Sequence, residues 1–297
     1  MIYKLKLITS MLIFSTIGIF VNYIDLPSGF IAFVRGAIGA VCLILFALVS
    51  RSAISKAEIK NNFWLLVISG AAIGFNWIFL FESYKYAGVP IGTLCYYMAP
   101  VFIIVASPFL LKERFTLKKL FSIILALGGM VFVSGIIGGE LPEGDIAIGI
   151  VFGLSAALLY ASVILMNKKL KDISVSNKTI VQLASAAVVV LPYSLAFESI
   201  EAAAFTPLGL SLLICVGVVH TGIAYLLYFG SLSGVTATTA AIFSYIDPAL
   251  AIVLSAVILS QPMDIFAGIG AVLILFGALL SEIEFKLERK NKQGVNI

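Results

Sequence analysis

Charged residues are scarce in this chain: 11% of its 297 residues are Asp, Glu, Lys or Arg, whereas 61% are hydrophobic. An ordinary soluble domain is roughly 45–50% apolar and about 25% charged, so a soluble fold of this size could not bury so much apolar surface. The net charge of +4 comes from bases spread over short loops, which argues against nucleic-acid binding. The composition predicts a protein that lies mostly within a lipid bilayer.

Residue types that carry catalytic or metal chemistry are also few. The chain has one histidine, and its three cysteines, Cys42, Cys95 and Cys215, lie in apolar runs without the spacing of a metal site. No Gly-x-x-x-x-Gly-Lys-Ser/Thr run for ATP phosphates occurs. A His-Glu-x-x-His motif and paired aspartates, which an intramembrane enzyme would need, are also missing. The sequence therefore predicts no metal, no cofactor and no enzymatic activity.

Long apolar runs, by contrast, fill the chain. A helix needs about 20 mostly apolar residues to cross roughly 30 Å of hydrocarbon, and ten such runs are separated by Gly, Pro and charged residues. The predicted fold class is all-α, a polytopic membrane protein with ten transmembrane helices. They are expected at residues 5–23, 29–50, 63–84, 91–111, 120–138, 147–166, 179–197, 209–230, 235–259 and 265–283.

Basic residues are distributed unequally between the two sets of loops. If the N-terminus is cytoplasmic, 17 of the 19 Lys and Arg residues fall in inner segments, and the outer loops are mainly acidic. The two exceptions are Lys85 in an outer loop and Arg35 within a span. This asymmetry follows the positive-inside rule and predicts a multi-pass protein of the inner (plasma) membrane, N-in and C-in, with a cytoplasmic tail at residues 286–297. The sequence leaves undecided whether the protein forms a homodimer.

The two halves of the chain match each other at a constant offset of 148 residues. Because five helices are an odd number, a second copy must enter the membrane from the opposite side, which predicts two inverted five-helix repeats at residues 1–140 and 146–285. Secondary transporters commonly have this plan, with a site at the repeat interface. The aligned pairs include Trp77 with Tyr225, Tyr97 with Tyr245, and Pro100 with Pro248.

The chain resembles the ten-helix EamA type of the drug/metabolite transporter superfamily. The resemblance rests on Phe33-Val34-Arg35-Gly36, the run from Tyr84 to Pro100, Leu111-Lys112-Glu113-Arg114-Phe115-Thr116 and Gly128-Gly129, with second-half copies at Pro248, Leu259-Ser260-Gln261-Pro262 and Gly277. Gln261 stands where the family often has an acidic residue. The resemblance implies efflux or exchange of small metabolites without ATP-binding machinery.

Three ionisable residues within predicted spans are candidates for the transport site, because a charge at bilayer depth is costly and usually functional. Asp247 lies in the middle of the predicted helix 235–259, where it could bind a substrate ammonium, carry a proton or serve as a structural partner of an arginine. Arg35 could pair with Asp247 or extend to the outer headgroups. His220 could couple transport to protons or form an interhelical hydrogen bond.

Polar aromatic residues occupy repeat-related positions. Trp77, Tyr225, Tyr97 and Tyr245 could line a cavity while offering a polar edge to a solute, and Asn76 adds donors and an acceptor. The alternative is ordinary packing of aromatic residues in a helix bundle. Pro100 and Pro248 are candidate hinges between the two halves.

The function predicted is a secondary transporter that exports or exchanges small neutral or zwitterionic metabolites, such as amino acids, by alternating access. Asp247 and Arg35 would supply the opposite charges that a zwitterion needs. Efflux of lipophilic cations is the alternative, with Asp247 as the counter-charge and tyrosines as cation-π partners. A non-transport membrane protein is a third interpretation, which the inverted repeat disfavours.

Overall fold

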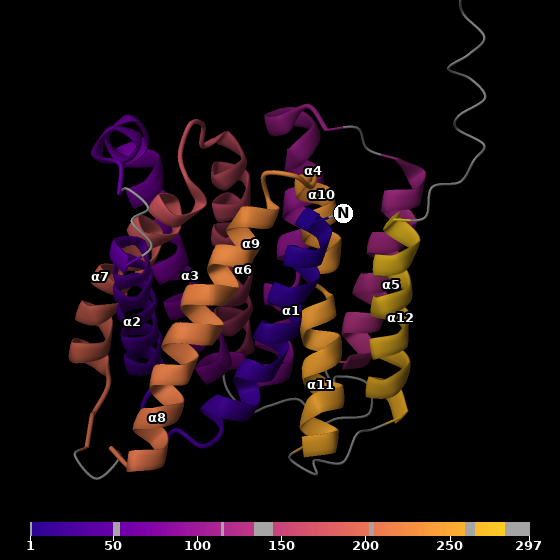
Figure 1. The fold of residues 1–297 in the computed structure, drawn as a ribbon. Coiled ribbons are helices and arrows are strands. Elements are labelled where there is room, and N and C mark those ends of the chain that lie inside the picture. Colours follow the sequence, from indigo (N-terminus) through magenta and orange to yellow (C-terminus); the bar gives the residue numbers. More distant parts are fainter. Residues whose placement is uncertain are drawn as a thin grey trace, which may run out of the picture.

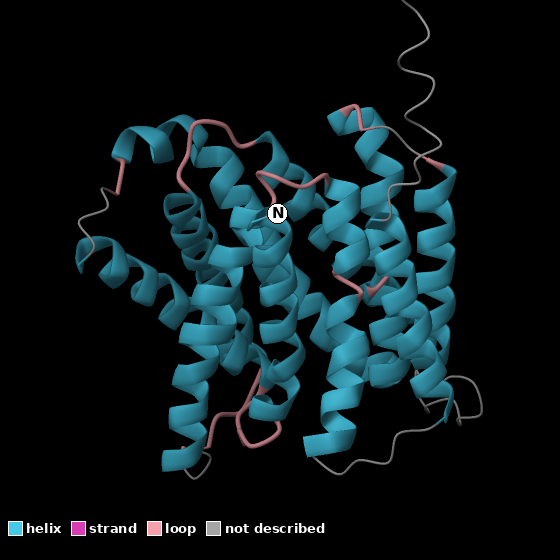
Figure 2. Ribbon diagram, turned by 45° about the vertical axis from the view of Figure 1, so that its right-hand side comes forward, coloured by secondary structure: helices cyan, strands magenta, loops and turns pink. Residues whose placement is uncertain are grey.

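Helices account for every regular element in the part of the chain that the structure describes (Figure 1, Figure 2). This computed structural model describes residues 2–49, 54–113, 116–133, 145–201, 205–258 and 265–282. Seven helical stretches in these ranges are long and apolar enough to cross a membrane. The predicted all-α class with several membrane spans is therefore confirmed.

The helices follow one another with short connections. In chain order they are α1 (Ile2–Val21), α2 (Ser28–Val49), α3 (Lys56–Tyr96), α4 (Ala99–Leu111), α5 (Leu117–Val133), α6 (Ile146–Lys169), α7 (Val175–Phe197), α8 (Pro207–Cys215), the π-helix η2 (Val216–Ile223), α9 (Ala224–Ser231), α10 (Ala237–Phe243), α11 (Ile246–Ile258) and α12 (Ile265–Glu282).

Most helix ends lie near their predicted positions, and two early starts have a local cause. Helix α3 begins at Lys56 rather than at 63, because the Ser55 side chain accepts a hydrogen bond from the backbone N–H of Glu58 at 3.3 Å and caps the helix. Helix α7 begins at Val175 rather than at 179, because the Ser174 side chain accepts a hydrogen bond from the backbone N–H of Asn177 at 3.2 Å and caps the helix. Several predicted features lie outside the described residues. They are residues 134–144, Gln261 and the tail at 286–297.

The predicted helices at 63–84 and 91–111 correspond to two stretches able to span a membrane, Lys56–Ala87 and Ile91–Leu111. Helix α3 (Lys56–Tyr96) contains the first stretch and the start of the second. The Thr93 hydroxyl lies 3.3 Å from that of Tyr84, although nine residues of straight helix would span about 13 Å. The chain therefore reverses direction between Ala87 and Ile91, and α3 passes through the bundle as two arms.

Close packing of α6 against both arms of α3 depends on two small residues. A Cβ atom on Gly149 would lie only 2.3 Å from that of Ala87, and one on Gly153 only 2.7 Å from that of Cys95. The Ser83 hydroxyl donates to the backbone carbonyl of Gly149 at 2.7 Å. Small residues and interhelical hydrogen bonds of this kind are typical where helices pack within a membrane.

The helices form a bundle in which one pair stands apart from the cavity described below. Helix α2 packs on α7 and η2, and α1 packs on α9 and α11. Helices α5 and α12 pack mainly on each other at one side of the bundle (Figure 1). The inner space is thus enclosed chiefly by α1, α2, α3, α4, α6, η2, α9 and α11.

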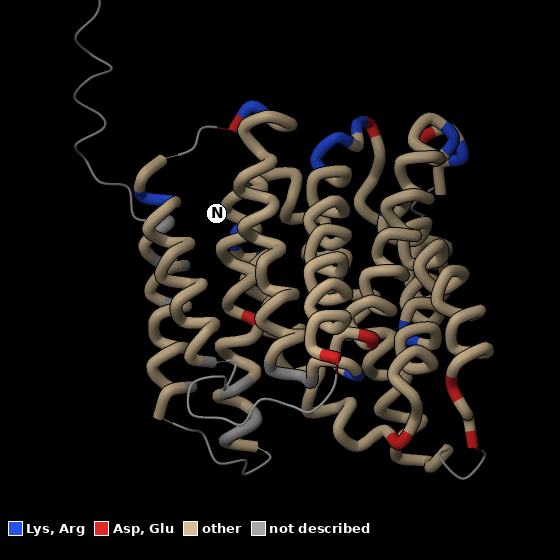
Figure 3. The backbone as a smooth tube through the Cα atoms, turned by 180° about the vertical axis from the view of Figure 1, so that it is seen from behind, with Lys and Arg blue, Asp and Glu red and all other residues tan. Residues whose placement is uncertain are grey.

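Lys and Arg gather mainly at one end of the bundle, whereas Asp and Glu occur at both ends (Figure 3). We call the end that contains Lys168 and Lys178 the basic end, and the opposite end, which contains Asp145 and Glu198, the acidic end. At the acidic end the Glu198 carboxylate accepts hydrogen bonds from the first backbone N–H groups of α2, at 2.7 and 2.8 Å. This contact joins the end of α7 to the start of α2.

Candidate functional site

Two helices are interrupted at equivalent places in the two halves. Residues 97–98 separate α3 from α4, and residues 244–245 separate α10 from α11. A proline follows each break, Pro100 in the first turn of α4 and Pro248 in that of α11. Proline is favourable there because the first N–H groups of a helix have no intrahelical partner. The single predicted helix at 235–259 is therefore two helices, and Asp247 lies in the first turn of the second.

The π-helix η2 interrupts the predicted helix at 209–230 and carries His220. The imidazole Nε2 lies 2.9 Å from the Thr16 hydroxyl on α1, and the Phe20 ring contacts it edge-on at 4.7 Å. Its other nitrogen, Nδ1, is buried without a hydrogen-bond partner. A π-helical turn often marks a functional position, and here it places a polar ring at the wall of the central cavity.

Arg35 lies against an aromatic face. Its guanidinium is 4.2 Å from the centre of the Trp77 ring, a cation-π geometry, and Gly36 leaves room for that ring beside α2. Within the described residues the guanidinium donates no hydrogen bond, and its Nε is buried without a partner. Trp77 thus fixes the plane of the guanidinium and leaves its donors free for a ligand.

Aromatic rings continue from Trp77 around the cavity. Tyr225 contacts Trp77 edge-on at 6.4 Å and Phe14 of α1 at 5.3 Å. On the other side, the Tyr160 ring lies 5.8 Å from that of Tyr96. The rings therefore form an aromatic wall with polar edges, which is the usual lining of a small-molecule pocket.

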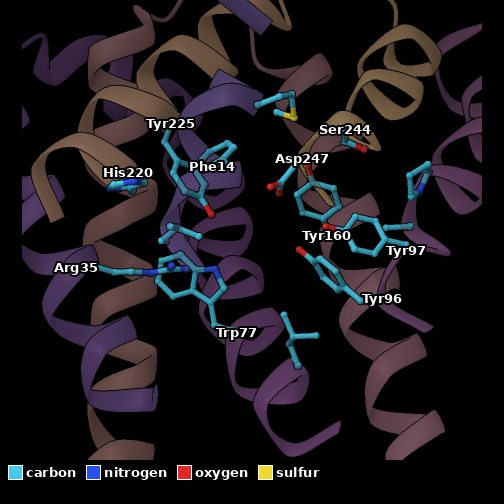
Figure 4. A pocket seen from close by; sticks show the side chains of 15 residues that line it. Phe14, Arg35, Trp77, Tyr96, Tyr97, Tyr160, His220, Tyr225, Ser244 and Asp247 are labelled. Atoms are coloured by element: carbon cyan, nitrogen blue, oxygen red, sulfur yellow. The ribbon is translucent and has the colours of Figure 1, made fainter. Parts of the chain in front are cut away.

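A central cavity of about 160 Å³ lies among these side chains. Figure 4 shows the Asp247 carboxylate pointing into it near Tyr225 and Tyr160, with Arg35 entering from the far side over Trp77. Within the described residues Asp247 and Arg35 form no ion pair, and the carboxylate has no hydrogen-bond partner. The lining residues are Met11, Phe14, Ile17, Arg35, Trp77, Leu80, Tyr96, Tyr97, Ala99, Pro100, Tyr160, His220, Tyr225, Ser244 and Asp247.

Most of the predicted site residues come together at this cavity. It is lined by Arg35, Trp77, Tyr97, His220, Tyr225, Asp247 and the candidate hinge Pro100. Three others lie behind this lining. Asn76 donates to the backbone carbonyl of Ala156 at 2.7 Å, Tyr245 is fully buried and donates to that of Tyr97 at 2.9 Å, and Pro248 is buried at the start of α11.

Several lining residues were missed by the sequence analysis. One of them is Tyr160. A tyrosine in the middle of the otherwise apolar run 147–166 is a signal by which it could have been predicted. Its hydroxyl lies 2.6 Å from that of Tyr228, so the pair joins α6 to α9. Phe14 and Ser244 offer no such signal, because a phenylalanine or serine in an apolar run is unremarkable in a membrane helix.

Comparison with known families now identifies the fold that holds this cavity. The model of the EamA-like transporter family matches residues 1–135 and again residues 147–282. The chain belongs to the EamA-like transporter family. As an EamA-like protein of the drug/metabolite transporter superfamily it is a membrane transporter, and the predicted resemblance is confirmed.

Relatives of this EamA-like transporter cover nearly its whole length. It is 30% identical to the uncharacterized transporter YxxF of Bacillus subtilis (strain 168) over 280 residues, which are 93% of this chain and 88% of YxxF. The uncharacterized transporter YoaV of the same organism is 25% identical over 88% of this chain and 89% of its own. A solved crystal structure with 18% identity superposes over 98% of both chains with a TM-score of 0.84, a likeness of fold alone.

Proposed function

We propose that this EamA-like transporter carries small zwitterionic metabolites, such as amino acids, through the central cavity. One observation supports this: Arg35 and Asp247 both face the cavity, and within the described residues the two side chains form no ion pair and Arg35 Nε is buried without a hydrogen-bond partner. Buried charges are costly unless they are paired. A substrate carboxylate at Arg35 and a substrate ammonium at Asp247 would pair both charges at once.

The size of the cavity favours small metabolites over drugs. Pockets for drug-sized ligands measure roughly 300–1,000 Å³, whereas this cavity measures about 160 Å³. Efflux of a lipophilic cation is the second candidate, because the tyrosine rings near Asp247 could bind a cation through their faces. Against it, the Arg35 guanidinium would repel a second positive charge in the same cavity.

Two inverted five-helix repeats, ten spans in all, are the architecture that we propose. The family model matches two segments of the chain in succession, and repeat-related residues meet in space. Trp77 contacts Tyr225, and the Tyr97 ring lies 6.1 Å from that of Tyr245. Two positions related by a two-fold axis meet in this way when the axis passes between them. Alternating access would then reorient the halves, with Pro100 and Pro248 as hinges.

The orientation we propose is N-in and C-in within the inner (plasma) membrane. The gathering of Lys and Arg at the basic end supports a cytoplasmic location for that end (Figure 3). The acidic end would then face outward.

Uptake into proteoliposomes tests the substrate class. Labelled neutral amino acids, other small metabolites and lipophilic cations are offered with and without a pH gradient, to the native protein and to Asp247→Asn. Glu82→Gln is the matched control, because this carboxylate pairs with Lys85 outside the cavity. We expect saturable amino-acid flux that Asp247→Asn abolishes and Glu82→Gln retains.

Three other outcomes would contradict parts of this proposal. Saturable flux of lipophilic cations alone would replace the zwitterion proposal with the second candidate. The absence of saturable flux for every solute, from well-reconstituted protein, would overturn both substrate classes. In the same assay, unchanged kinetics for Pro248→Ala would remove the hinge role of that proline.

A further inference from the structure

The connection between α9 and α10, residues 232–236, is held by charged side chains from other helices. It lies at the basic end, where α9 stops and α10 begins. The orphan carbonyls at the end of one helix and the orphan N–H groups at the start of the next are normally satisfied by local caps or water. Here charged groups from α6, from α7 and from the residues after α4 satisfy many of them.

Two lysines bind the carbonyl groups at the end of α9. Lys168, at the end of α6, donates to the backbone carbonyls of Leu232 and Val235. Lys178, near the start of α7 and only 6% exposed, donates to that of Phe229 at 3.0 Å. Cations are favourable at a helix C-terminus, where the helix dipole is negative.

One carboxylate binds the start of α10. Both oxygens of Glu113 accept hydrogen bonds there, from the backbone N–H of Ala237 at 2.6 Å and from the N–H and hydroxyl of Thr238 at 3.2 and 2.9 Å. The Ser107 hydroxyl of α4 also lies 3.3 Å from that of Thr238. An anion is favourable at a helix N-terminus, so the charge signs match both helix ends.

The sequence after α4 explains how Glu113 reaches α10. Lys112 ends the helix in the left-handed conformation, with φ of 56°, and the Glu113 N–H then bonds back to the carbonyl of Ser107 at 3.4 Å. A residue in the left-handed conformation commonly ends a helix in this way. This conformation directs residue 113 away from the axis of α4 and toward α10.

These contacts join helices that surround the central cavity. Helices α4 and α6 contribute Ala99, Pro100 and Tyr160 to its lining, Ser244 lies between α10 and α11, and Asp247 lies in the first turn of α11. Between the cavity and the basic end, Leu7, Tyr228 and Leu232 are at most 1% exposed. At the acidic end, by contrast, a recess of about 420 Å³ lies beside Phe81, Tyr84 and Phe197. The structure is therefore closed at the basic end.

We propose that Glu113, Lys168 and Lys178 form a charged latch that closes the basic end of the transporter. To open that end, α9 and α10 must leave α4 and α6, and this separation exposes the carbonyls of α9, the N–H groups of α10 and three ionised side chains. The latch thus stabilises the state closed at the basic end, and its release accompanies opening. The proposal rests on alternating access but not on the identity of the substrate.

A distance measurement by double electron–electron resonance tests the latch without any substrate. Spin labels are placed at Lys169 on α6 and Ser233 in the α9–α10 connection, both exposed, with Cys42, Cys95 and Cys215 replaced by alanine. We expect one short distance in the native protein. Glu113→Gln and Lys168→Met should add a second, longer distance.

Lys60→Met is the matched control for Lys168→Met. Lys60 is also a lysine near the basic end, but it is exposed on α3 and is not one of the three latch residues. We expect this substitution to leave the distance unchanged. Should Glu113→Gln fail to fold, Thr238→Val is the second variant. It removes the hydrogen bond from the Thr238 hydroxyl to Glu113 and is expected to add the same longer distance in a smaller fraction of the molecules.

Native distances in both the Lys168 variant and the folded Glu113 or Thr238 variant would overturn the latch. An equal shift in Lys60→Met would also overturn it, because the loss of any lysine near the basic end would then suffice. Neither result depends on whether amino acids are transported, so the failure of this proposal and the failure of the proposed substrate class are distinguishable.

Discussion

Arg35 and Trp77 act together at the wall of the cavity, and their geometry separates two properties of the arginine side chain. Lysine would keep the positive charge but would lose the planar stack on the indole and the fork of donors that matches a carboxylate. The contribution of the charge can therefore be measured apart from that of the geometry.

We predict that Arg35→Lys raises the KM for amino-acid uptake about 10- to 100-fold, because a hydrogen bond to a charged group contributes roughly 1.5–3 kcal/mol and each 1.4 kcal/mol is tenfold in affinity. The KM for the matching decarboxylated amine should stay nearly constant. Concentration series for both solutes in proteoliposomes give the two values. Lys85→Arg, at the acidic end and outside the cavity, is the control. Equal losses for both solutes would contradict a carboxylate site at Arg35.

Individual site residues were predictable from the sequence only where burying a polar or charged side chain costs much free energy. Arg35, His220 and Asp247 were found because a polar or charged group within an apolar run requires a reason. Tyr97 and Tyr245 were paired by the repeat, yet only Tyr97 lines the cavity. The Tyr245 hydroxyl instead donates to a backbone carbonyl, and hydropathy cannot distinguish that role from a lining role.

At the scale of the element, the interruptions of the helices decide where the site lies. The breaks at residues 97–98 and 244–245 lie within continuous apolar runs, so hydropathy alone does not detect them. The prolines two and three residues further on were visible in the sequence and marked the correct turns. The π-helix at Val216–Ile223 had no such marker, because its residues also suit an α-helix.

Close packing of α3 on α6 gives a prediction for stability. Gly149→Val is expected to destabilise the protein by about 1–3 kcal/mol, the usual effect of overpacking, since its Cβ would meet Ala87 at 2.3 Å. Gly128→Ala on α5, where nothing lies within 4 Å of an added Cβ, is the control. Thermal unfolding in detergent measures both. Equal unfolding temperatures for Gly149→Val and the native protein would show that α6 and α3 can separate freely.

At the scale of the whole molecule, the sequence was most informative, because the bilayer limits the possible folds to a few. Composition and run length predicted the helical class, and charge asymmetry predicted that basic residues gather at one end, which the structure displays (Figure 3). The reversal within α3 was anticipated only as a gap between two helices. The contacts across the cavity, such as Glu113 with α10, depend on packing and could not be predicted.

Orientation can be tested with one residue at each end. We predict that Lys169→Cys, at the basic end, reacts with a membrane-impermeant thiol reagent only in inside-out vesicles. Ser199→Cys, in the exposed segment after α7, should react only in intact cells, because the acidic end faces outward in the orientation we propose. The background lacks the three native cysteines. The reverse labelling pattern would place the basic end outside.

The two unpaired charges of the cavity have an electrical consequence. A carboxylate and a guanidinium sum to zero, and a zwitterion adds zero to them. The empty and the loaded carrier would then bear the same net charge, and neither would move net charge when it reorients. The membrane potential could neither drive nor oppose such a cycle, and in the absence of a co-transported proton the direction of flux would follow the concentration gradient of the cargo.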